Sequence, residues 1–169
     1  MLLAINANNT NTVFALWDGD RLHGAWRIAT ETKRTADEYV VWLDHLLGLG
    51  GLTRGRINGT IIASVVPDAN FNLVKFCVDY CASTPLMVGE PGIALGMKAM
   101  VDRPDEVGAD RLINTIAVHD RYPGAAIVVD FGTATTFDVV DDVGNYRGGV
   151  IAPGINLSLQ ALEGAAAKL

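Results

Sequence analysis

The sequence predicts an α/β protein built from two related lobes, each a mixed sheet with helices on its faces. Two observations support this prediction. A strand-turn-strand unit occurs twice, at residues 2–17 and at residues 126–140. Between and after these units, short apolar strand-like runs alternate with segments whose apolar residues recur at helical spacing, as in sheets flanked by helices. The expected lobes are residues 1–115 and 116–169.

The first lobe is expected to open with three strands joined by short turns, at residues 2–6, 13–17 and 21–28. A helix then begins at Thr35, because a threonine followed three residues later by Glu38 is a capping-box pattern. Its apolar residues recur at helical spacing: Tyr39, Val40, Leu43, Leu46 and Leu47.

The rest of the first lobe alternates strands and helices. The expected elements are a strand at 60–66, a helix at 68–81, a strand at 85–88, an irregular stretch at 89–106 and a helix at 112–121. The buried stripe of the helix at 68–81 is expected to be Phe71, Val74, Val78 and Cys81.

The second lobe is expected to be incomplete. Strands at 126–130 and 136–140 lead to a glycine-rich and proline-rich run at 148–154, and a helix at 155–168 follows. No later strand-helix pair corresponds to residues 60–81.

Composition excludes several classes of partner. The 169 residues are 50% hydrophobic, with a net charge of -6 and a pI of about 4.9. Scattered basic residues and a net negative charge argue against nucleic acid as a partner. No apolar run approaches the roughly 18 residues of a membrane span, and no basic segment precedes an apolar one at the N-terminus. Cys77 and Cys81 are expected to be core thiols, so the predicted location is the cytoplasm.

The turn of the second unit combines groups that bind phosphate and cations. Asp130 ends an apolar strand, and Gly132 and Thr133 follow it. Glycine allows backbone N–H groups to approach a phosphate, the threonine hydroxyl is a further donor, and the carboxylate can hold a cation. The alternative is a strand that simply ends in a polar turn. The duplication favours function and predicts a nucleotide site with two lobes.

The matching turn of the first unit is rich in donors but has no carboxylate. Asparagine tolerates left-handed backbone conformations, so Asn8 can replace a glycine there. The residues expected to contact the nucleotide are Asn6, Ala7, Asn8, Asn9, Thr10, Asn11, Thr12 and Val13.

A third candidate is Gly108, Ala109, Asp110 and Arg111, at the start of a predicted helix. Asp110 is either an N-cap residue or a functional carboxylate. Arg111 has the geometry to bind a substrate carboxylate, and replacing it by alanine is expected to weaken binding while leaving the fold intact. The glycines at 148–149 and 154 fit either a close approach of the backbone to a flat ligand or a strand leaving the sheet.

Together these segments resemble the type III pantothenate kinases, of the superfamily that includes acetate and sugar kinases, heat-shock proteins and actin. The resemblance spans nearly the whole chain. It rests on residues 9–12, 34–38, 63–67, 88–89, 108–111, 130–136 and 148–154.

The resemblance implies duplicated actin-like, ribonuclease H-like lobes and ATP-dependent phosphorylation of pantothenate, the first step of coenzyme A synthesis. By match, Asp110 is the catalytic base, and residues 108–111 bind pantothenate. Asp130 binds a monovalent cation, potassium or ammonium, while Thr133 and residues 6–13 contact ATP. Magnesium is the expected divalent ion. A homodimer is expected too, and the apolar residues at 63–67 and after Leu112 support it.

Two features depart from the family pattern. The first turn of the family reads Asp-x-Gly-Asn-Thr, and here Asn6 stands in place of the carboxylate that should steer magnesium. Family members also continue well beyond residue 169, so the chain is expected to be C-terminally truncated. The alternative function is therefore a non-catalytic protein that binds nucleotide or pantothenate.

Overall fold

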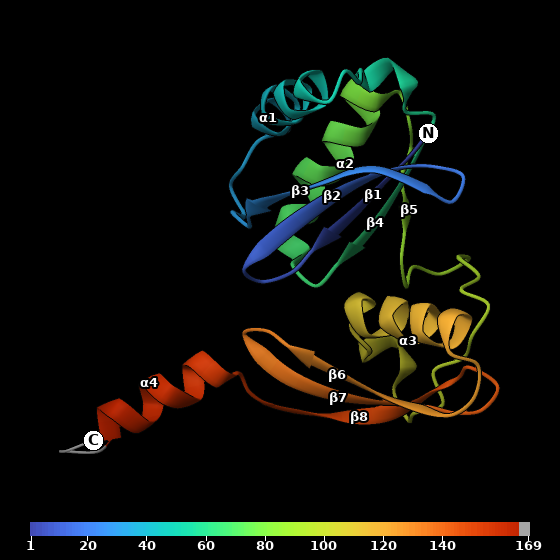
Figure 1. Ribbon diagram of the computed structural model, residues 1–169, viewed down its shortest axis with the longest axis vertical. Helices are drawn as coiled ribbons and strands as arrows, with labels where there is room; N and C mark the ends of the chain where they lie inside the picture. Colours follow the sequence, from blue (N-terminus) through green and yellow to red (C-terminus); the bar gives the residue numbers. More distant parts are fainter. Residues whose placement is uncertain (166–169) are drawn as a thin grey trace. The chain divides into compact units, whose positions relative to one another are not determined.

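The computed structural model describes residues 1–165, which fall into two compact units, Met1–Ile93 and a second that begins at Ala94 (Figure 1). Helix α3 (Ala109–Arg121) groups with the second unit. The lobe boundary predicted between residues 115 and 116 lies within this helix and stays a prediction.

The first unit contains a five-stranded mixed sheet in the order β3-β2-β1-β4-β5. Strands β1, β2 and β3 form an antiparallel meander, while β4 and β5 continue the sheet parallel to β1. This arrangement puts the C-terminal ends of β1 and β4 at one edge, where Ala7 pairs with Ser64. The strands are β1 (Leu2–Ala7), β2 (Asn11–Asp18), β3 (Arg21–Ala29), β4 (Gly59–Ser64) and β5 (Leu86–Met87).

Helices α1 (Ala36–Leu49) and α2 (Pro67–Cys81) cover one face of this sheet, as Figure 1 shows. The core is centred on Phe14 of β2, whose ring centroid lies 5.5 Å from Tyr39, 5.2 Å from Trp42 and 5.9 Å from Phe76. The predicted capping box of α1 is present, because Thr35 and Glu38 bond each other's backbone N–H groups. A 3₁₀ turn (Arg54–Arg56) links α1 to β4.

The buried face of α2 differs from the predicted stripe. Phe71 is 75% exposed and Val78 is 46% exposed, whereas Leu73 and Phe76 are fully buried. The helix contains two apolar stripes at helical spacing, and only the sheet decides which one faces the core. Of the predicted residues, Cys81 is buried as expected, and Val74 is half-buried and packs against the core.

The two cysteines are buried thiols, as the sequence predicted. Burial raises the pKa of Cys77 to about 12 and that of Cys81 to about 11. A thiol with a raised pKa is a poor nucleophile and a poor metal ligand at neutral pH. Both residues therefore belong to the core that packs α2 on the sheet.

The second unit is built on a three-stranded antiparallel sheet in the order β6-β7-β8. It repeats the meander of β1 to β3, so two related α/β lobes are confirmed. Helix α3 packs against this sheet, and residues 98–100 run beside the start of β8, where Ala99 bridges Tyr146. The elements are β6 (Ala126–Phe131), β7 (Ala134–Val140), β8 (Tyr146–Pro153), α4 (Ile155–Ala165) and a 3₁₀ turn (Pro104–Glu106).

The second lobe is incomplete within the described residues, as expected. After β8 the described residues form only α4, and the predicted end of that helix, at residue 168, lies outside the described residues. On the face of the sheet away from Asp138, Ile127 pairs with Val139 and Val129 with Phe137. These four side chains are 40% to 68% exposed.

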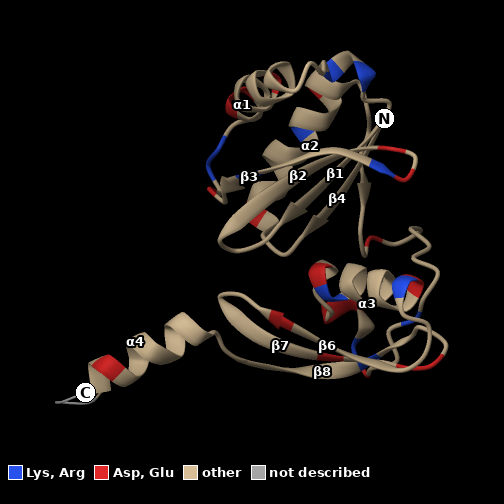
Figure 2. Ribbon diagram, viewed as in Figure 1, with Lys and Arg blue, Asp and Glu red and all other residues tan. Residues whose placement is uncertain are grey.

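The surface carries dispersed charge, with Lys and Arg on several separate elements (Figure 2). Among the described residues, no helix is long and apolar enough to cross a membrane. Of the apolar residues that supported the homodimer, Ala63 and Leu112 are buried within the chain, whereas Val65, Val66 and Ile113 are half-buried. The dimer stays a prediction.

Candidate active site

Helix α3 carries Asp110 and Arg111 in its first turn. Gly108 is the N-cap residue and makes no side-chain cap bond. Oδ1 of Asp110 accepts a hydrogen bond of 2.8 Å from the backbone N–H of Arg111. The alternative that Asp110 is the N-cap residue is therefore wrong, and its carboxylate lies where the helix dipole favours negative charge.

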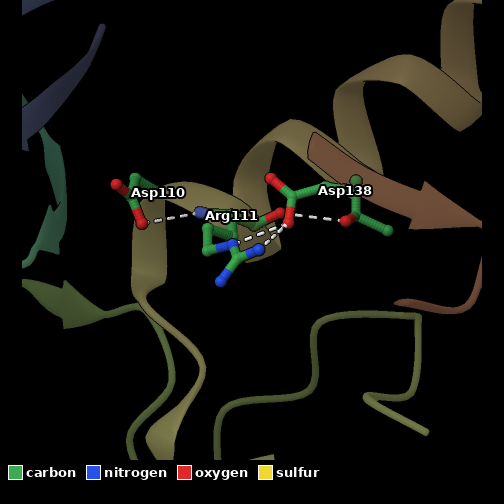
Figure 3. A network of polar contacts seen from close by, with 4 residues as sticks. Asp110, Arg111 and Asp138 are labelled. Atoms are coloured by element: carbon green, nitrogen blue, oxygen red, sulfur yellow. Dashed lines mark hydrogen bonds and ion pairs between the residues drawn. The ribbon is translucent and has the colours of Figure 1, made fainter. Parts of the chain in front are cut away.

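The Arg111 side chain forms an ion pair with Asp138 of β7, shown in Figure 3. Nε of Arg111 donates a 2.6 Å hydrogen bond to Oδ1 of Asp138, and Nη2 lies 2.5 Å from the same oxygen. The Asp138 side chain is 0% exposed and that of Arg111 is 15% exposed. A carboxylate at this depth is costly without a partner, so the guanidinium is what allows Asp138 to be charged here.

Strand β8 completes the surroundings of the guanidinium. The Arg111 Cζ lies 5.5 Å from the ring centroid of Tyr146, a cation–π distance. A Cβ added to Gly149 would lie 2.4 Å from Nη2 of Arg111 and 2.6 Å from Oδ1 of Asp138. Only a residue without a side chain fits at that position. The sequence left open whether the glycines at 148–149 approach a flat ligand or mark a strand leaving the sheet, and in the structure Gly149 lies beside the guanidinium of Arg111 and the Phe137 carbonyl.

Tyr146 is part of the same cluster. It is 2% exposed, and burial, followed by the nearby charge of Asp138, raises the pKa of Tyr146 to about 12. The hydroxyl therefore stays protonated at neutral pH and adds no further negative charge beside Asp138.

The carboxylate of Asp110 is partly buried, and this burial raises its pKa above the ordinary aspartate value. The backbone N–H and the charge of Arg111 oppose the increase, while the charges of Asp130 and Asp138 add to it. Asp130, the predicted cation ligand, therefore contributes to the raised pKa of Asp110, but less than burial does. A raised pKa brings a carboxylate closer to the basicity that a general base needs.

Asp130, near the end of β6, and Thr133, in the β6–β7 turn, are both exposed. Gly154 closes this turn, since its backbone N–H donates to the Thr133 carbonyl at 3.1 Å. A Cβ at Gly154 would lie 2.3 Å from the carbonyl oxygen of Gly132 and 2.4 Å from that of Thr133. Glycine is therefore required at position 154, because its backbone lies directly against the backbone of residues 132–133.

The β1–β2 turn contains the other predicted nucleotide contacts. Oδ1 of Asn6 and Oδ1 of Asn8 are buried without a hydrogen-bond partner. Thr12 is fully buried, and its hydroxyl lies 2.9 Å from the hydroxyl of Thr30. The Thr30 hydroxyl in turn donates a 2.6 Å hydrogen bond to the carbonyl oxygen of Asn8. Thr12 therefore holds the turn together, and its contact with a phosphate stays a prediction. Asn9 and Thr10 are exposed.

The oxygen atoms of the predicted site residues are too few to hold a metal ion by themselves, and they suit a cation that is also coordinated by a bound ligand. Among the described residues there is no group of three or more His, Cys, Asp or Glu side chains that could hold a metal ion. Magnesium is commonly bound by one or two carboxylates together with substrate phosphates, and it keeps several waters. Asp130 and the acceptor oxygen of Asn6, each within its own unit, are suited to coordination shared with a ligand.

Sequence reasoning identified Asp110 and Arg111 but missed Asp138. One signal was available, because Asp138 interrupts an apolar strand between Phe137 and Val139. A charge in such a run has either a buried partner or a ligand. The partner could not be predicted, since Arg111 lies 27 residues earlier in the chain.

Comparison with known proteins identifies the family. The profile of the family described as "Type III pantothenate kinase" matches residues 2–169. The chain belongs to the type III pantothenate kinase family. It is 60% identical to the type III pantothenate kinase of Rhodospirillum rubrum and 59% identical to that of Paramagnetospirillum magneticum. Each match covers all of this chain, but only 66% and 65% of the respective relative.

Solved structures agree on the fold. A putative 2-dehydro-3-deoxygalactonokinase from Sinorhizobium meliloti matches with a TM-score of 0.57 at 14% identity, over 100% of this chain and 57% of that one. A putative Baf family transcriptional activator from Campylobacter jejuni matches with a TM-score of 0.55 at 18% identity, over 99% and 62%. The fold of this pantothenate kinase homologue is therefore that of the duplicated actin-like ATPases and sugar kinases.

The ion pair makes Arg111 a stabilising residue, which corrects the expectation that its loss leaves the fold intact. Arg111→Ala should destabilise the protein by about 3–5 kcal/mol, because Asp138 is left as an unpaired buried charge. Urea unfolding measures this. The control is Arg103→Ala, whose partner Glu106 is exposed, and its cost should be about 0–1 kcal/mol. Equal, small losses in the two variants would contradict this account of the pair.

Asp110→Asn should stabilise the protein at neutral pH. Because the pKa of Asp110 is higher in the folded state than in the unfolded state, the folded state is favoured when this carboxyl is protonated. Stability is therefore lost as the pH rises from the pKa of the unfolded state, near 3.9, through the pKa of the folded state. Asparagine keeps the acceptor for the Arg111 N–H without the buried charge. Thermal unfolding should show a gain at pH 7 that disappears below about pH 4.

The matched control for that experiment is Asp141→Asn. Asp141 accepts hydrogen bonds from the backbone N–H groups of Asn145 and Val143, which lower its pKa. Its substitution should therefore reduce stability at neutral pH, the opposite sign. A loss of stability at pH 7 in Asp110→Asn would show that burial does not dominate at that carboxylate.

Proposed function

We propose that the protein transfers the γ-phosphoryl group of ATP to pantothenate, the first step of coenzyme A synthesis. The observation that carries this proposal is the pairing, in one turn of α3, of a partly buried carboxylate with a guanidinium held in a fixed position. Membership of the type III pantothenate kinase family supports the same reaction.

Asp110 is the proposed general base. The hydroxyl oxygen of pantothenate forms a bond to the γ-phosphorus, the bond from that phosphorus to the β–γ bridging oxygen breaks, and the hydroxyl proton passes to Asp110. ADP and phosphopantothenate are the products. The raised pKa of Asp110 favours acceptance of this proton.

The remaining residues position the two substrates. Gly108, Ala109 and Arg111 are proposed to bind pantothenate, with the guanidinium on its carboxylate. Residues 6–13 and Thr133 are proposed to contact the phosphates of ATP, and Asp130 a monovalent cation, potassium or ammonium. Bound magnesium supplies neutralisation of phosphate charge. Since phosphoryl transfer depends mainly on positioning and charge, these contacts form the larger part of catalysis.

The relatives do not support the alternative of a non-catalytic binding protein, because those described above carry the kinase name. A homodimer and a cytoplasmic location remain part of the proposal. Sedimentation equilibrium at tens of micromolar protein measures the first of these.

A coupled assay of ADP release tests the proposed reaction in the protein purified at its natural length. Turnover should require pantothenate, and Asp110→Asn should reduce kcat by about 10²–10⁴-fold, the usual share of a general base. The folded state of the variant is checked by its thermal unfolding. ADP release that is independent of pantothenate would contradict the proposal. An unchanged kcat in Asp110→Asn would show that Asp110 is not the general base.

Asn6→Asp should increase magnesium-dependent turnover, by up to about 10²-fold if the phosphates are misplaced without the carboxylate. The buried acceptor of Asn6 has no partner within the chain, so a carboxylate there should also lower stability until magnesium and ATP are added. The control is Asn58→Asp, an exposed change of equal charge in the same unit. If turnover in Asn6→Asp does not exceed that of the unmodified chain, Asn6 is a harmless substitution.

A further inference from the structure

Breaking the Arg111–Asp138 pair is expected to be costly, but stability alone does not explain why a buried ion pair is present at this position. Removing two charges from water is costly, and apolar residues of similar volume often stabilise a fold equally well. The cost here is high, because Asp138 is 0% exposed and its Oδ2 has no hydrogen-bond partner. A pair of this kind is explained when the geometry it imposes on the arginine is needed elsewhere.

The guanidinium of Arg111 is held from several directions. Asp138 contacts both Nε and Nη2, the ring of Tyr146 lies 5.5 Å from Cζ, and the backbone of Gly149 is so close that an added Cβ would lie 2.4 Å from Nη2. The backbone N–H of Arg111 is fixed as well, through Asp110. Both ends of the residue are therefore constrained, which reduces the entropy lost when a ligand binds.

One nitrogen of the group remains available. Nη2 is buried, whereas Nη1 makes no hydrogen bond or ion pair within the described residues. Figure 3 shows this third nitrogen pointing away from Asp138. The charge of the guanidinium is largely balanced by Asp138, so an anionic ligand would be recognised by the direction of two N–H bonds more than by net charge.

We propose that Asp138 is a positioning residue, which turns the guanidinium of Arg111 so that its Nη1 edge binds the carboxylate of the substrate. This inference rests on the proposed function. Asp138 touches neither substrate nor phosphate in this role, and it acts through Arg111 alone. Its effect is therefore limited to substrates that carry a carboxylate, which separates it from a general structural role.

The test compares pantothenate with pantothenyl alcohol, in which a hydroxymethyl group replaces the carboxylate. Asp138→Asn is assayed with both substrates, in the protein at its natural length. The KM for pantothenate should rise by about 10-fold to 100-fold, the range of one charged hydrogen bond, while the KM for the alcohol stays unchanged. The control is Asp141→Asn, which lies next to the end of β7, has no contact with Arg111 and should preserve the preference for the acid.

A second measurement does not depend on the variant being folded. In the unmodified protein without ligand, the ¹⁵N resonances of Nη1 and Nη2 of Arg111 should be separate, because Asp138 prevents rotation of the guanidinium. Addition of pantothenate should shift Nη1, and addition of the alcohol should not. A freely rotating guanidinium in the ligand-free protein would overturn the proposal.

The outcomes distinguish this inference from the proposed function. If the unmodified protein phosphorylates pantothenate and Asp138→Asn keeps the full preference for the acid, the role of Asp138 is wrong and the kinase activity stands. If the unmodified protein does not phosphorylate pantothenate, the proposed function fails, and the inference fails with it. If both substrates lose affinity equally in Asp138→Asn, Asp138 is a structural residue only.

Discussion

The main constraint on the second unit is that one carboxylate, that of Asp138, is buried and needs a partner of opposite charge. Asp138 lies in the middle of β7, and its position in the pleat directs it to the face that α3 covers. Its charge is tolerated only because Arg111 reaches it from the first turn of that helix. Three other features surround this contact: the start of α3, the ring of Tyr146 and the missing side chain at Gly149. Because all three lie around the Arg111 side chain, a change in one of them would disturb the others.

The same contact links two chemical functions that could otherwise vary independently. Arg111 donates its backbone N–H to Asp110 and its side chain to Asp138. A shift of the helix would change the distance from Arg111 to Asp138 but would carry Asp110 with it, so the proposed base and the proposed carboxylate-binding group keep a fixed relation to each other. Adjacency in sequence is what achieves this, because neighbouring residues in a first helical turn move as a unit. Accurate positioning of this sort is the main source of rate in phosphoryl transfer.

What could be predicted from the sequence was local. Local patterns were enough to recognise the two meanders, the capping box of Thr35 and Glu38, and a helix that begins within one residue of the observed start of α2 at Pro67. The face that α2 buries could not be recognised in this way, because Leu73 and Phe76 form a stripe as regular as the one that contains Phe71. Asp138 was missed for the same physical reason: the residue that makes its burial possible is distant in sequence. Patterns identify candidates, and long-range packing selects among them.

The two turns of the repeated meander have opposite electrostatic characters. Near the β6–β7 turn, the negative charge of Asp130 adds to the increase that burial causes in the pKa of Asp110. At the β1–β2 turn the corresponding groups are neutral, and the buried acceptors of Asn6 and Asn8 have no partner within the chain. An unpaired acceptor at this depth costs free energy until a donor or a hydrated cation reaches it. The first turn therefore contributes oriented oxygen atoms and no charge. In the proposed function, its affinity for a cation therefore comes from the phosphates that the cation carries, so nucleotide and divalent ion are expected to bind to this turn together.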